Sequence, residues 1–294
     1  MNIRNGIYTS GVAALLLLAT GCAGSPADSA AGNNGAGSVQ AAASPDPQAV
    51  TKVDEFLSSN GPAEQARQIA IRDCMAKAGF KWEETVPKQM KVQDLVPLKP
   101  LSIEQARSVG YASPQQSQSQ EAQNAQTPAA AEAFMGPAGA PKVSVNVLGM
   151  KPSVSSKGCL AESYKQVYGS VENGMMATGV TINAVLPGIN AAIGDSSVAD
   201  ANKKWSECMT AASYPNLETP DRAWDTARQN PTNADAIAVA DAKCREGVSY
   251  EDVRKAALNK YLTTFLTRNE TLITEIQTIR KEAAANAQKI IAGL

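Results

Sequence analysis

Four cysteines in the body of the chain have the spacing of disulfide partners. Cys74, Cys159, Cys208 and Cys244 are an even number, as expected where an oxidising compartment lets cysteines pair. None of their spacings resembles C-x-x-C. Because the sequence contains no histidine, a zinc site would need all four thiolates, and we expect disulfides and no metal site. Four cysteines allow three pairings.

Two of these cysteines lie in similar stretches, "RDCMAKAGF" and "SECMTAASY". Aligning Cys74 with Cys208 matches four further positions: Met75 with Met209, Ala78 with Ala212, Gly79 with Ser213, and Phe80 with Tyr214. Cys159 and Cys244 then become the second cysteine of each unit, which predicts the pairs Cys74–Cys159 and Cys208–Cys244. In each stretch the cysteine would hold the end of a helix, the Met and the aromatic residue would pack beside it, and the small residue would let the chain turn.

The lack of histidine also removes most catalytic arrangements. Histidine is the commonest general base and a member of the Ser-His-Asp and Cys-His sites. The sequence has no G-x-G-x-x-G, no phosphate-binding P-loop and no G-x-S-x-G. We therefore expect no catalytic residues, no cofactor and no enzymatic activity. A net charge of −1 argues against binding to nucleic acid.

The N-terminal residues predict export and a lipid anchor. An apolar run at 11–19 is too short to span a bilayer and follows Arg4, as in a secretory signal. "LLLLATGC" resembles the lipobox of bacterial lipoproteins, with Ala19 where leucine is usual. The resemblance implies a signal peptide over 1–21, diacylation (palmitate) of Cys22, and anchorage to the outer face of the cell membrane. The alternative is an ordinary secreted protein with a free Cys22.

The rest of the chain divides by composition. Residues 22–47 are rich in Ala, Gly, Ser and Asn and predict a flexible tether. We expect the first Cys-Met…Cys unit over 48–198, with a disordered Gln- and Ala-rich insertion at about 112–142, and the second unit over 199–248. Helical periodicity dominates both units and predicts a mainly α fold.

An apolar stretch, "GMMATGVTINAVLPGINAAIG", interrupts the first unit. Gly179, Pro187 and Gly188 break it, so we do not expect a transmembrane helix. It is either a buried connection or the wall of a pocket or protein contact.

The C-terminal residues 249–294 contain no proline, and no glycine before Gly293. They predict one helix of about 40 residues, with Ser249 and Asp252 as a capping box. Apolar residues recur at spacings of three and four, as in a coiled coil. This seam either packs on the chain's own helices or binds a partner or a second copy. The candidate partner-binding residues are Leu262, Phe265, Asn269, Leu272, Ile276 and Ile279.

Together the lipobox, "RDCMAKAGF", "GCLAESYKQVYG", "WSECM" and "ADAKC" resemble a group of actinobacterial lipoproteins of uncharacterised function. The resemblance implies location and disulfides but no activity. We expect a lipoprotein of the cell envelope that binds an envelope protein, a cell-wall component or itself without catalysis. The alternative is the solute-binding lipoprotein of a transporter, with a cleft between the two units.

Overall fold

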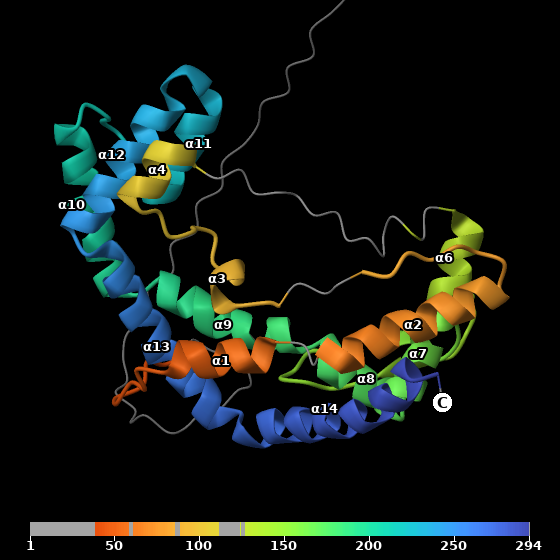
Figure 1. Ribbon diagram of the computed structural model, residues 1–294. Coiled ribbons are helices and arrows are strands. Elements are labelled where there is room, and N and C mark those ends of the chain that lie inside the picture. The colour runs from red at the N-terminus through yellow and green to blue at the C-terminus, as the bar shows by residue number, and fades with distance from the viewer. Residues whose placement is uncertain (1–38, 59–60, 86–88, 112–123, 125–126, 294) are drawn as a thin grey trace, which may run out of the picture. The chain divides into compact units, whose positions relative to one another are not determined.

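The computed structural model describes residues 39–58, 61–85, 89–111, 124 and 127–293 (Figure 1). The described chain consists of helices and one two-stranded sheet, which confirms the mainly α fold class. Residues Ser38–Leu294 form one compact unit, and all the hydrophobic clusters and both disulfides described below lie within it. The signal peptide, Cys22 and the tether up to residue 38 lie outside the described residues.

The larger hydrophobic cluster draws on helices from both ends of the chain. Its main contacts join α2 to α7 and α14, and α13 to α1 and α9. These helices, with α8, have the following bounds: α1 Ala49–Leu57, α2 Gly61–Lys77, α7 Cys159–Tyr168, α8 Val171–Thr178, α9 Thr181–Ile193, α13 Tyr250–Arg268 and α14 Glu270–Ile291.

A second core region forms around α12, which packs on α4, α10 and α11. The bounds are α4 Ile103–Val109, α10 Ser196–Ala211, α11 Pro220–Gln229, the 3₁₀ turn η1 Pro231–Asn233 and α12 Ala234–Gly247. Because α4 comes from the first predicted unit and α12 from the second, the two units do not pack as separate blocks. Leu101 and Ala106 are buried against Ala238 and Ala242.

Short elements complete the fold. They are α3 Val92–Leu95, α6 Pro128–Met135, β1 Lys142–Ser144 and β2 Ser153–Ser155. Helix α6 lies inside the segment expected to be disordered, and for residues 127–142 that expectation is wrong. Phe134 of α6 stacks on Trp82 with ring centroids 4.7 Å apart, in the cluster that contains Cys74 and Cys159. Residues 112–123 of the insertion lie outside the described residues.

The end of the predicted tether is also ordered. The Ala42 amide donates to the Lys260 carbonyl over 3.1 Å, and the Asp46 amide donates to the Thr263 hydroxyl over 2.8 Å. The Asn259 side chain of α13 also donates to the Pro47 carbonyl over 3.1 Å. The flexible segment predicted to reach residue 47 therefore ends earlier.

Both predicted disulfides are present. Cys74 pairs with Cys159, and Cys208 with Cys244. The two similar stretches also end their helices in the same way. Gly79 and Ser213 have φ of 86° and 72°, and the following amides, of Phe80 and Tyr214, donate over 2.9 Å to the Met75 and Met209 carbonyls. These are Schellman C-caps, in which a left-handed residue follows the helix.

The C-terminal helical segment contains a break that the sequence did not predict. Asn269 lies between α13 and α14 with φ −118°, and its side-chain amide donates to the Phe265 carbonyl. The side chain thus provides a hydrogen-bond donor for a backbone carbonyl in the last turn of α13. At the other end Ser249 has φ 51° and makes no side-chain cap, so the predicted capping box is absent.

Candidate functional site

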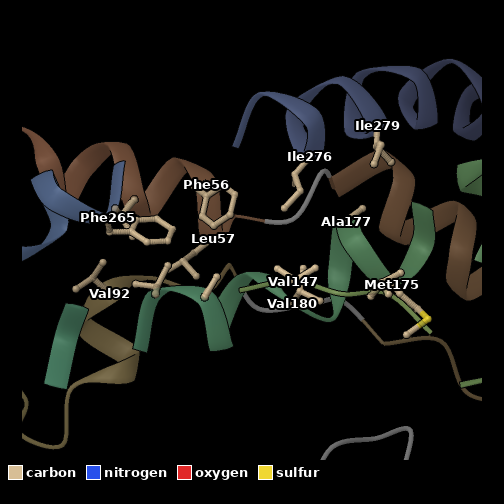
Figure 2. Close-up of a cluster of buried hydrophobic side chains, with 14 of the residues drawn as sticks. Phe56, Leu57, Val92, Val147, Met175, Ala177, Val180, Phe265, Ile276 and Ile279 are labelled. Carbon is tan, nitrogen blue, oxygen red and sulfur yellow. The ribbon is translucent and has the colours of Figure 1, made fainter. Parts of the chain in front are cut away.

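The residues proposed for partner binding lie mostly in the protein's own core. Leu262, Phe265, Ile276 and Ile279 are buried in the larger cluster, and Figure 2 shows three of them there. Leu272 is half-buried against the same cluster, and Asn269 forms the break described above. Of the two alternatives for the seam, packing on the chain's own helices is the one that these four buried residues follow. A periodic apolar stripe shows that a face is buried but not against what.

The apolar stretch Val171–Ile193 has the length and composition of a membrane span. Half of its most apolar part is buried in the protein, and the stretch divides into α8 and α9. Gly188 of α9 approaches Leu262 of α13: a Cβ at Gly188 would stand 3.4 Å from a Leu262 methyl. This close approach supports the interpretation as a buried connection.

A groove of about 1010 Å³ lies where α4 meets α12 and the start of α13. Leu101 and Ile103 line one side, and Ala242 and Tyr250 the other. The remaining lining residues are polar or charged: Ser102, Glu104, Arg107, Ser108, Arg245, Glu246, Ser249, Glu251 and Asp252. The groove is thus a mixed surface with a majority of polar side chains.

The wall on the α12 side contains a buried ion pair. Arg245 and Asp241 lie four residues apart on α12, and their side chains are 2% and 0% exposed. The guanidinium donates to both carboxylate oxygens, over 2.8 and 2.7 Å, and also to the Lys99 carbonyl over 2.9 Å. Two paired hydrogen bonds of this kind fix the orientation of both side chains.

Two aromatic side chains complete the environment of Asp241. The Trp205 indole N–H donates to Asp241 Oδ1 over 2.9 Å, and the Tyr111 hydroxyl donates to Oδ2 over 2.9 Å. Burial and the Asp241 charge raise the pKa of Tyr111 far above its usual range. Burial works against the charge of Arg245, but the hydrogen bond and charge of Asp241 outweigh it and raise the pKa of Arg245. Tyr111 therefore stays neutral and Arg245 stays charged at physiological pH.

The exposed walls of the groove are acidic. Glu104, Glu246 and Asp252 are solvent-exposed and form no ion pair with any described residue, whereas Arg107 is the corresponding unpaired cation. Glu251 is half-buried and pairs with Arg245 over 3.3 Å. Burial raises the pKa of Tyr250, which lines the groove, to about 12, so this phenol stays neutral and donates to Asn202. Three free carboxylates against one free guanidinium favour a cationic ligand.

A second hollow, of about 620 Å³, lies beside α4 and is lined by the Cys208–Cys244 disulfide with Tyr214 and Val239. Among the described residues, no three His, Cys, Asp or Glu side chains come close enough together to hold a metal ion. The sequence did not identify the groove, because its residues come from two distant stretches of the chain, 101–108 and 242–252. The only local signal is the Asp-Arg spacing around Cys244.

Two of the three tryptophans, Trp82 and Trp205, belong to the core, and the third, Trp224, is half-buried. Trp82 is 4% exposed and donates to the Gln68 side chain, as Trp205 does to Asp241. Trp224 lies under Arg228, with the guanidinium carbon 4.6 Å from the ring centroid.

Comparison with protein-family models, with curated proteins and with solved structures finds no match to this chain.

Proposed function

We propose that this protein is a lipoprotein anchored through Cys22 on the outer face of the cell membrane, where it binds an envelope component without catalysis. The lipobox-like sequence and the two disulfides support the location, because disulfides persist in oxidising compartments. The likeness to actinobacterial lipoproteins of uncharacterised function agrees with both.

The observation that carries the binding role is the acidic groove between α4 and α12–α13. One of its walls is the disulfide-linked helix α12, whose Asp241 and Arg245 are hydrogen-bonded to residues of other segments: Trp205, Tyr111 and the Lys99 carbonyl. Rigid elements under a polar surface favour recognition of a partner. We assign the groove to a basic segment of an envelope protein, because the unpaired charges of its walls are mainly carboxylates.

A role in transport of a small solute has less support. Solute sites are usually concave and mainly apolar, with few polar groups. The volume of the groove is in the range of such sites, but Glu104, Glu246 and Asp252 stand exposed along it.

Photocrosslinking in the native membrane tests the proposal. Photoreactive residues at Ser108, Glu246 and Asp252 sit in the groove, and matched controls at Lys203 and Lys281 are exposed elsewhere. We expect the same envelope protein to be captured at the groove positions and not at the controls. Charge reversal of a wall residue that carries no crosslinker, Glu104→Lys, should lower the yield at Ser108 about tenfold, because a cationic segment would then be repelled.

Capture that is equal at Lys203 and at the groove, or that Glu104→Lys leaves unchanged, would show that the groove is not the site. Crosslinks placed at Leu262 and Ile276 should report contacts within the chain only, since both side chains are fully buried.

A further inference from the structure

The β1–β2 hairpin has valines buried in the core and an exposed turn at its tip. Lys142 pairs with Ser155 and Ser144 with Ser153, and Val147 and Met150 close the tip with hydrogen bonds of 3.0 and 2.9 Å. Val145 and Val147 are buried in the larger cluster, and Figure 2 shows Val147 among its side chains. The hairpin is thus fixed to the body of the protein by its valines.

Leu148 at the tip is both exposed and in an unfavourable backbone conformation. Leu148 and Gly149 have φ of 51° and 81°, the pattern of a type I′ turn. Asn, Asp and Gly are preferred at the first of these positions, and leucine there is strained. Its side chain is 51% exposed, so packing does not repay this strain. A strained apolar residue held out at a tip indicates a contact outside the chain.

The hairpin is also basic. From residue 133 to 161 the sequence has three lysines and no acidic residue, although the whole chain has a net charge of −1. Lys142, Lys151 and Lys157 are exposed and form no ion pair with the described residues. The flanking acids are Glu132 and Glu162, and Glu162 lies 4.0 Å from Lys165.

We propose that this hairpin binds the anionic surface of a lipid membrane, with Leu148 inserted among the headgroups and the three lysines over the lipid phosphates. The hairpin combines apolar area at its tip with lysines beside the tip (Lys151) and at its open end (Lys142 and Lys157), the two properties that interfacial binding requires. The contact goes beyond the proposed groove function. Because it uses residues 142–157 alone, it does not depend on the lipid at Cys22.

Vesicle binding of the compact unit, residues 38–294, tests this contact without the anchor. The probe is vesicles of phosphatidylcholine with or without about one third phosphatidylglycerol. Each lysine near an anionic surface contributes about fivefold, so replacing Lys142, Lys151 and Lys157 by Gln should weaken binding about 100-fold. The matched control replaces Lys203, Lys204 and Lys255 by Gln, which changes the net charge equally and should weaken binding less than about threefold.

Leu148→Asn tests the apolar contribution. Asn tolerates the left-handed conformation better than Leu, so the variant should fold at least as stably as the parent, while binding to anionic vesicles falls about tenfold. Equal losses from the two lysine triplets, unchanged binding of Leu148→Asn, or equal binding to neutral and anionic vesicles would each overturn the proposal. Failure to bind any vesicle, with binding of an acidic protein in its place, would overturn it as well.

Discussion

The two helix caps after Cys74 and Cys208 differ in one residue, and that residue carries an energetic difference. Gly79 and Ser213 occupy the same left-handed position of the same hydrogen-bonded motif. Glycine adopts this conformation without strain, whereas serine is disfavoured there. The repeat seen in the sequence is thus a repeat of a backbone motif, and only one copy has its preferred residue.

Exchanging these residues should move stability in opposite directions. A Cβ at Gly79 would meet no atom within 4 Å, so the effect of Gly79→Ala comes from the backbone alone. We expect Gly79→Ala to lower the free energy of unfolding by about 1 kcal/mol and Ser213→Gly to raise it by up to about 1 kcal/mol. Urea unfolding with both disulfides intact measures both. Shifts of the same sign would contradict a shared capping motif.

At the scale of elements, Asp195 joins the start of α10 to α13. Its carboxylate accepts from the Ser197 amide as the N-cap of α10, from Lys260 over 2.8 Å and from the Tyr261 hydroxyl over 3.1 Å. The hydrogen bond from Lys260, followed by that from the Ser197 hydroxyl, holds the pKa of Asp195 well below its usual range. One side chain therefore both begins a helix and holds it to its neighbour.

This lowered pKa predicts a pH dependence. The folded-state pKa lies below the unfolded value of about 3.9, so the stabilisation is complete above that pH and is lost as the pH falls toward the folded-state pKa. Asp195→Asn keeps a capping oxygen but loses the charge. At pH 7 it should be less stable by up to about 1 kcal/mol, and below about pH 4 the difference should shrink. Denaturant unfolding at pH 7 and pH 3 checks this, and a difference that grows in acid would refute it.

Elements with local signals were predictable from the sequence, and those defined by distant contacts were not. The Cys-Met stretches predicted both disulfides because each combines a helix end with a partner helix later in the chain. The periodicity of the seam on the last helices was predicted correctly, but its role stayed open, because burial against α2 and burial against another protein give the same pattern. The groove could not be predicted, since α4 and α12 meet only in the tertiary structure.

At the scale of the whole molecule, two core regions stabilise the fold, and each has a disulfide within it or beside it. Cys74–Cys159 closes a separation of 85 residues beside the larger cluster, and Cys208–Cys244 closes 36 in the smaller one. On the chain-entropy model, loops of these lengths contribute roughly 4.6 and 3.8 kcal/mol, upper figures because strain and residual structure subtract from them.

Replacing both cysteines of one disulfide by serine should show whether the two core regions are stabilised separately. Cys208→Ser with Cys244→Ser should lower hydrogen-exchange protection in α10–α12 while α2, α7 and α14 stay protected, because those helices have a separate core. Cys74→Ser with Cys159→Ser is the reciprocal control and should act on α2 and α7. Equal loss of protection everywhere in both variants would indicate a single cooperative core instead.

The side chain of Arg280 donates hydrogen bonds to backbone carbonyls at the ends of α1 and α8. It donates to the carbonyls of Phe56, in the last turn of α1, and Ser58, just after it, and to the Ala177 carbonyl near the end of α8. Phe56 and Arg280 are 224 residues apart in the chain. At 5–20 residues per second, a ribosome needs about 10 to 45 s to make the chain between them. Helices α7 and α9 are made within that interval, but α13, the main neighbour of α1, and α14, a main neighbour of α2, are completed only at its end. Part of the apolar surface of α1 and α2 therefore stays uncovered, and the newly made chain depends on being kept from aggregation until its last helix is complete.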